Sequence, residues 1–432
     1  MRIRTALLLG LLSFLVYNAN LREISSQDTI PARVLPVAIV QERTVALDMF
    51  FRDWPTDTPL PYWVLRVNGH YLSRYPLLPG LLAVPIYAVP VALFGGDSWV
   101  RINVLAKLTA SLIAALSVAL VYLAAVRLGP DTVALAVTLV YAIGTSAWSV
   151  ASQGLWGHGP AALFLALSLV CLLYAEERPW LLDAAGLAAG LMLASRLITV
   201  FVAAALLGCA LGYDRRRGMR ALGWCAVVAV PLLAYNVWTF GSLQGGYAQI
   251  HADFRNEGFS GTWTTLPWEG LAGLLLSPSR GLFLYSPILL ATVLGIGPAL
   301  RRGPHRRAFA WLVGGLGMSL LVISTYSVWY AGTSFGPRLF TDFMPAMVLF
   351  LVPAWRTLEG RRSLAAVVML LFAVSVGVQA VGAFYYPSRR DLDWNSTPRG
   401  VPIKARVWNW HDTQLGRLVR NGPHPLGFGD YE

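Results

Sequence analysis

A single acidic residue stands where it could act as a base beside a membrane. Asp28 lies in the stretch Ser25 to Arg33, a few residues after an apolar N-terminal segment. A carboxylate just above a bilayer is well placed to take a proton from the hydroxyl of an acceptor. Asp28 also precedes an apolar-periodic stretch, as helix N-caps do, so a capping role is the alternative interpretation.

Arginines accompany this acid at several separate points of the chain. Arginine offers a planar fork of N–H donors to an oxyanion, which suits it to a lipid-linked phosphate. The predicted donor- and phosphate-binding residues are Arg33, Arg74, His158, Arg196, Arg280 and Arg338. The alternatives are an interface anchor for Arg74, a snorkelling residue for Arg196, and an ion pair between Arg338 and Asp342.

Aromatic and polar residues near these arginines could contact a sugar. Aromatic rings stack on sugar faces, and glycine lets backbone approach a ligand. The predicted substrate-binding residues are His70, Tyr71, Tyr75, Gln153, Tyr285, Tyr330 and Asp342. His158 has no neighbours at metal-ligand spacing, so no cofactor is predicted and a divalent cation is left open.

The composition excludes a water-soluble enzyme. Of 432 residues, 56% are hydrophobic and 13% are charged, whereas an ordinary soluble domain has about 25% charged residues. The net charge of +12 comes from short arginine clusters between apolar runs. Such clusters indicate membrane topology, with membrane lipids and not nucleic acid as the partner.

The apolar runs predict an all-α polytopic membrane protein. At ~20 residues per crossing they give about eleven transmembrane helices. The N-terminal segment after Arg2 and Arg4 is interpreted as an uncleaved anchor with a cytoplasmic N-terminus. We expect bends at 153–160, where Gly and Pro interrupt an apolar run, and near Arg196, because an arginine is costly inside the bilayer.

One apolar segment is not expected to cross. The segment 77–94 contains three prolines, and its crossing would move five basic clusters to the outside, so we predict an interfacial or re-entrant helix on the outer face. The predicted domains are a transmembrane domain, 1–385, with a first outer loop at 20–100, and an outer-face tail, 386–432. The tail could cover the acceptor site or rest on the membrane as an amphipathic helix.

This pattern resembles the GT-C superfamily of polytopic glycosyltransferases, with the closest likeness to bacterial relatives of the protein O-mannosyltransferases and aminoarabinose transferases. The likeness covers roughly residues 1–240, together with 329–342. The motifs that carry it are the first-loop acid Asp28, the Tyr75-Pro76-x-x-Pro79 start of the interfacial helix, and Gly332-x-x-x-Gly336-Pro337-Arg338.

The resemblance implies transfer of a sugar from a polyprenyl-phosphate donor to a lipid, glycan or protein acceptor, usually with inversion. It also implies a bacterial cytoplasmic (inner) membrane location with a periplasmic active site. Asp28 matches the position of the catalytic carboxylate of the first loop. The bend at His158 lacks the second acidic residue of many relatives, and no Asp-Glu pair like that of the mannosyltransferases follows Asp28.

Two other classes of function are weighed against this enzyme. A flippase or transporter of lipid-linked sugars would need ionisable groups near the middle of the bilayer, whereas most charges here lie at the ends of apolar runs. A non-catalytic envelope-assembly protein would not need Asp28. For the enzyme, one base and several arginines are sufficient, because a phosphate leaving group needs cationic stabilisation but no general acid.

Overall fold

Helices form almost all of the regular structure. The computed structural model describes residues 1–256, 261–301, 303–387, 392–398 and 401–427. The helices up to residue 173 are α1 (Arg2–Asn18), η1 (Gln27–Thr29), α2 (Ile30–Glu42), η2 (Asp48–Phe50), α3 (Leu78–Phe94), α4 (Trp99–Leu128), α5 (Asp131–Gly144), η3 (Ala147–Ala151) and α6 (His158–Leu173).

The helices that follow continue this pattern to the tail. Those up to residue 301 are α7 (Leu181–Ser195), η4 (Leu197–Thr199), α8 (Val200–Tyr213), α9 (Arg215–Phe240), α10 (Tyr247–Asn256), α11 (Pro267–Leu276), α12 (Leu282–Tyr285), η5 (Pro287–Leu289) and α13 (Leu290–Arg301). The last are α14 (Arg306–Thr325), η6 (Arg338–Phe343), α15 (Met344–Leu349), α16 (Leu351–Leu358), α17 (Arg362–Phe384), α18 (Ile403–Arg406) and α19 (Gln414–Asn421).

The all-α prediction is wrong in one detail, because the first loop contains a β-hairpin. Strand β1 (Val64–Val67) pairs antiparallel with β2 (His70–Ser73), with Val64 opposite Ser73. The turn is Asn68-Gly69, and both residues have positive φ, at 50° and 89°. A two-residue turn of this kind matches the twist of a hairpin, and Asn-Gly is its preferred sequence.

Several helices are long and apolar enough to span a membrane. Within the described residues these are α4, α9, α14 and α17, and a fifth candidate is the pair 338–349 and 351–358, bent by 48°. Six further apolar helices are shorter, namely 78–94, 131–144, 158–173, 181–195, 197–213 and 287–301. The molecule is therefore a helical membrane protein, and the count of about eleven spans stays a prediction.

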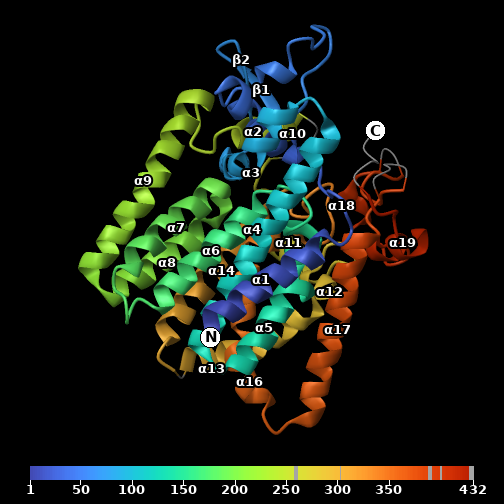
Figure 1. Ribbon diagram of the computed structural model, residues 1–432. Helices are drawn as coiled ribbons and strands as arrows, with labels where there is room; N and C mark the ends of the chain where they lie inside the picture. The colour runs from blue at the N-terminus through green and yellow to red at the C-terminus, as the bar shows by residue number, and fades with distance from the viewer. Residues whose placement is uncertain (257–260, 302, 388–391, 399–400, 428–432) are drawn as a thin grey trace.

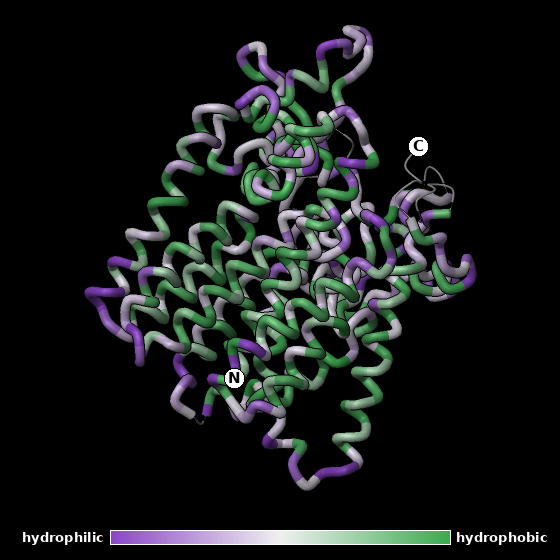
Figure 2. The backbone as a smooth tube through the Cα atoms, viewed as in Figure 1, coloured by the Kyte–Doolittle hydropathy of each residue, from purple (hydrophilic) through white to green (hydrophobic). Residues whose placement is uncertain are grey.

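Hydrophobic residues dominate the middle of the molecule, and hydrophilic residues gather at its two ends (Figure 2). The N-terminus lies at the same end as the α8–α9, α13–α14 and α16–α17 connections, whereas the hairpin, α2, α3 and α10 lie at the other (Figure 1). The ends therefore differ in chemistry, because the three connections carry the arginine clusters 214–220, 301–307 and 356–362. The tail helix α19 packs beside the top of α17 (Figure 1).

Small residues bring the helices close enough to fix the loops between them. A Cβ on Gly186 of α7 would lie 2.0 Å from the carbonyl oxygen of Ala221 in α9, so only glycine permits this approach. A Cβ on Gly80 of α3 would lie 2.9 Å from the Leu35 side chain of α2. Close backbone packing of this kind is how helices associate in a membrane, and here it packs α7 against α9 and α3 against α2.

Candidate active site

A cavity of about 1590 Å³ opens between the first loop and the helical bundle. Its polar wall includes residues from distant parts of the chain: Asp28, Tyr62, Arg74, Tyr75, Arg196 and Arg338. Its apolar wall comes from the start of α8 and the end of α14, with Val200, Phe201, Val322 and Ile323. The cavity therefore joins a charged end to a surface that suits an apolar chain.

Asp28 contacts three side chains on the cavity wall. Its carboxylate accepts hydrogen bonds from Tyr62 Oη at 2.5 Å and Tyr75 Oη at 3.0 Å, and from Arg338 Nη1 at 2.9 Å. It caps no helix: Ser26 caps η1, and Thr29, at the N-cap of α2, makes no side-chain capping bond. The capping interpretation of Asp28 is therefore wrong, because its carboxylate is used across the cavity.

The environment of Asp28 keeps its carboxyl ionised. Burial alone would raise the pKa of Asp28, but the Arg338 charge and the Tyr62 and Tyr75 hydroxyls outweigh burial and leave the pKa below its ordinary value. The Arg338 guanidinium also lies over the Trp156 ring at 4.3 Å and donates from Nη2 to the Ala331 carbonyl at 2.7 Å. The ion pair is therefore held from two sides.

The hairpin explains why two tyrosines meet at Asp28. Tyr62 precedes β1 by two residues and Tyr75 follows β2 by two residues, so they lie opposite each other in the extension of the observed register. Tyr75 is one of the predicted substrate-binding residues, whereas Tyr62 is not among them. The Asn68-Gly69 turn predicts a hairpin from the sequence, and the register of that hairpin places Tyr62 opposite Tyr75.

A second buried ion pair lies behind the cavity. Asp342 accepts from Arg196 Nε at 2.8 Å and contacts His158 Nδ1 at 2.7 Å, and its side chain has no exposed surface. The proposed pairing of Arg338 with Asp342 is therefore wrong, because each pairs with a different partner. The resemblance places a second acid at the His158 bend, and Asp342, from a distant segment, supplies a carboxylate beside that histidine.

Two of the predicted arginines line the cavity, and each pairs with a carboxylate. Arg74 binds Asp253 of α10, and Arg338 binds Asp28. Within the part of the chain that the structure describes, the buried Nε atoms of Arg74 and Arg338 have no hydrogen-bond partner. Both Nε atoms are enclosed, so an anionic ligand in the cavity would meet these two arginines through their guanidinium charge.

Most of the other predicted site residues lie outside the cavity wall. Arg33 is buried against Glu23 at 3.4 Å and Asn103 at 2.7 Å. His70 contacts Asp48 at 2.6 Å, and Tyr71 stacks on Phe51. Neither Gln153 nor Tyr285 lines the cavity, whereas Tyr330 does.

Arg280 is fully buried and makes five hydrogen bonds. It donates to the carbonyls of Ser279, Tyr330 and Gly332 and to the side chains of Asn395 and Gln414. Because a guanidinium has five N–H donors, none remains for a phosphate. The predicted phosphate-binding role of Arg280 is therefore wrong.

Sequence reasoning missed an aromatic wall of the cavity. Its residues are Tyr247 and His251 of α10, Trp263, and Tyr326 after α14. Their ring centroids lie 5.2 to 6.3 Å from one another along the wall, and Tyr247 reaches Tyr75 at 5.6 Å. Residues far apart in sequence form this wall, so no local motif marks it.

Sequence reasoning also missed a buried polar cluster under the first loop. Lys107 of α4 donates to Gln153 Oε1 at 2.6 Å, and Asn20 donates to the same oxygen at 2.6 Å. The backbone N–H of Ile24 bonds the Gln153 carbonyl at 2.7 Å. These contacts fix the segment that leads into Asp28.

Among the described residues, no three His, Cys, Asp or Glu side chains come together as a metal site would require.

One solved structure has a fold similar to that of this chain. No protein-family model matches the sequence, and no curated protein matches it. The solved structure of ArnT from Cupriavidus metallidurans bound to undecaprenyl phosphate is similar, with a TM-score of 0.53 and 15% sequence identity over 88% of this chain and 69% of that chain. ArnT is a GT-C aminoarabinose transferase. The chain therefore shares the overall helical fold of ArnT.

Proposed function

We propose that this protein transfers a sugar from a polyprenyl-phosphate donor to an acceptor hydroxyl at the outer face of a bacterial inner membrane. One observation carries the proposal: an ionised carboxylate, Asp28, touches an arginine, Arg338, on the wall of a large cavity that has both a charged and an apolar side. The GT-C fold and the lipid phosphate named with ArnT agree with it.

In this proposal the arginines hold the donor phosphate. Arg74, Arg196 and Arg338 all line the cavity and bring three positive charges to it. The polyprenyl chain lies along the apolar wall formed by α8 and α14. Arginine suits this task because it binds phosphate in a fork and stays charged when it is buried.

Asp28 is the general base of the proposed reaction. The acceptor oxygen attacks the anomeric carbon, its proton passes to Asp28, and the bond from the anomeric carbon to the phosphate oxygen breaks. The leaving polyprenyl phosphate keeps the electron pair, and the arginines stabilise its charge. Attack opposite the leaving group inverts the anomeric carbon. A phosphate that binds Arg338 also competes with Asp28 for that guanidinium and frees the base.

A turnover assay tests the proposed function. Purified protein is incubated with a panel of polyprenyl-phosphate sugars and a panel of acceptors, and free polyprenyl phosphate is measured. We expect release with at least one donor, and release that depends on the acceptor. The contrary result is that every donor binds without release of polyprenyl phosphate, while sealed vesicles that contain the protein translocate the donor across their membrane. The protein would then be a transporter, and the enzyme proposal fails.

The proposed topology has about eleven spans, with the N-terminus and the arginine clusters in the cytoplasm. The separation of the arginine-rich connections from the first loop supports it (Figure 1). The three native cysteines are buried, so a thiol reagent should label only a cysteine that is introduced at the surface. We expect an impermeant reagent to label Asp57→Cys in intact cells and Arg216→Cys only after lysis. The reverse result would contradict the orientation.

A further inference from the structure

The C-terminal tail is tied to the loop that carries Arg338. The loop runs from Tyr330 to Pro337, between α14 and η6, and Arg338 follows it directly. Three of its residues have positive φ, namely Ala331 at 64°, Gly332 at 59° and Gly336 at 54°. Backbone of this shape is not held by helix or sheet hydrogen bonds, so side chains must fix it.

Arg280 holds the first half of this loop. Its Nε donates to the Tyr330 carbonyl at 2.7 Å, and its Nη2 donates to the Gly332 carbonyl at 3.0 Å. Between these two carbonyls lies the Ala331 carbonyl, which accepts the bond from Arg338 Nη2. Arg280 therefore fixes the backbone on both sides of the group that orients Arg338.

Gln414, the first residue of α19, holds the second half. It is fully buried, and its Oε1 accepts from Gly336 N at 2.9 Å and from Arg280 Nη1 at 2.9 Å. Its Nε2 donates to the Ser334 carbonyl at 2.8 Å. One side chain of the tail thus binds the loop at two points and the arginine that holds the rest of it.

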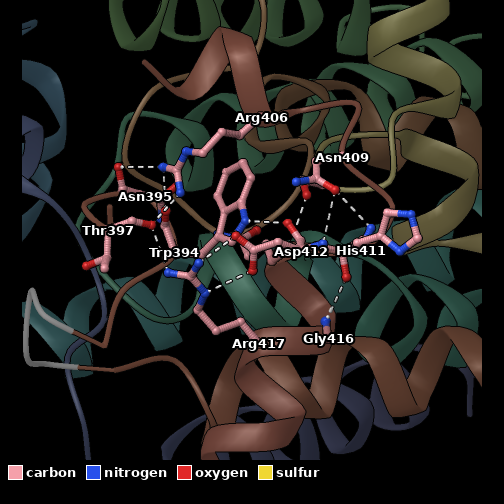
Figure 3. A network of polar contacts seen from close by, with 12 residues as sticks. Trp394, Asn395, Thr397, Arg406, Asn409, His411, Asp412, Gly416 and Arg417 are labelled. Carbon is pink, nitrogen blue, oxygen red and sulfur yellow. Dashed lines mark hydrogen bonds and ion pairs between the residues drawn. The ribbon is translucent and has the colours of Figure 1, made fainter. Parts of the chain in front are cut away.

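The tail itself is internally fixed, so it can act as a support. Figure 3 shows Trp394 beside Arg406, Asp412 and Arg417. Arg406 lies over the Trp394 ring at 4.5 Å, and Trp394 Nε1 donates to the Asp412 carbonyl at 2.8 Å. Arg417 closes the network through Asp412 at 2.5 Å. None of these contacts involves the loop at 330–337.

We infer that Gln414 and Arg280 are positioning residues, by which the C-terminal tail holds Arg338 against Asp28 and in line with the donor phosphate. The inference rests on the proposed function for its catalytic consequence. It gives the tail a task other than covering the acceptor or lying on the membrane, and it replaces phosphate binding as the task of Arg280.

The position of Arg338 also affects proton binding at Asp28. The charged and titratable groups that face this carboxylate are Arg338, Arg196, Tyr62, Tyr75, Tyr247 and Tyr326. Arg338 is the cation in direct contact with it. If the loop loosens, the charge of Arg338 acts on Asp28 less strongly, so burial raises the pKa of Asp28. The acidic limb of the pH–rate profile then moves to higher pH.

The test compares three variants of the full-length protein in detergent or nanodiscs. Gln414→Met keeps the size of the side chain and removes its polar atoms, whereas Gln414→Glu keeps the acceptor for Gly336 N. Arg417→Gln is the matched control, because it weakens the tail network without contacting the loop. The readouts are hydrogen exchange of the amides in 330–338, kcat, and the acidic limb of the pH–rate profile.

We expect Gln414→Met to raise loop exchange, to lower kcat on the order of 10- to 100-fold through misplacement of Arg338, and to move the acidic limb upward. Gln414→Glu should restore most of the protection at Gly336, and Arg417→Gln should change each of the three readouts much less than Gln414→Met does. Unchanged loop exchange in Gln414→Met would overturn the inference, as would equal effects in Arg417→Gln. A wild type that releases no polyprenyl phosphate refutes the proposed function, while loop exchange still decides whether the tail holds the loop.

Discussion

Replacing Asp28 by Asn should reduce sugar transfer about 1000-fold, the size expected when a general base is lost. Asn has the shape of Asp and can still accept the Tyr62 and Tyr75 hydrogen bonds, but it cannot take the proton of the acceptor. Donor affinity should not fall, because Arg338 loses an anionic competitor. The measurements are release of polyprenyl phosphate under single-turnover conditions and equilibrium binding of polyprenyl phosphate.

The control for this variant is Asp57→Asn, in an exposed part of the same loop. It removes one carboxylate from the first loop without touching the cavity, so transfer should stay at the wild-type rate. Full activity in Asp28→Asn would exclude the proposed mechanism. A loss of donor binding in that variant would show that Asp28 serves the fold of the site and not proton transfer.

The apolar runs of the sequence predict much of the helical layout. The helical structure breaks within the Gly- and Pro-rich stretch 153–160, just before α6 begins at His158, and α7 ends at Ser195 beside Arg196, as expected. A helix, α3, occupies the segment that the prolines and the charge pattern marked as non-crossing, although its depth in the membrane stays a prediction. These features follow from local physics: breakers end helices, and a charge resists burial in lipid.

The partners within the site could not be predicted in the same way. Asp28 and Arg338 are 310 residues apart, and only the packed bundle brings them together. Arg280 has the same local surroundings of Gly, Ser and aromatic residues as a ligand-binding arginine, but three backbone carbonyls and two side chains of the tail accept all five of its hydrogen bonds. The hairpin is different, because the Asn68-Gly69 turn was available in the sequence and predicts the pairing of Tyr62 with Tyr75.

Replacing Arg338 by Gln should affect both substrate and base. The donor phosphate loses a cationic ligand, so kcat/KM for the donor should fall on the order of 100- to 1000-fold, as when one stabilising donor is removed from a developing anion. Donor affinity should fall as well. This is opposite to the expected result for Asp28→Asn, so the pair of variants separates phosphate binding from proton transfer.

The pH dependence of Arg338→Gln follows from the position of Asp28. The charge of Arg338 is the largest effect that lowers the pKa of Asp28. Without it, burial raises the pKa of Asp28. The base is active only when ionised, so activity is then lost at a higher pH as the solution is acidified. The control is Arg66→Gln, which changes an exposed arginine of strand β1. It should leave the acidic limb and donor affinity at their wild-type values. If Arg338→Gln binds donor normally and keeps the wild-type acidic limb, Arg338 neither holds the phosphate nor controls the base.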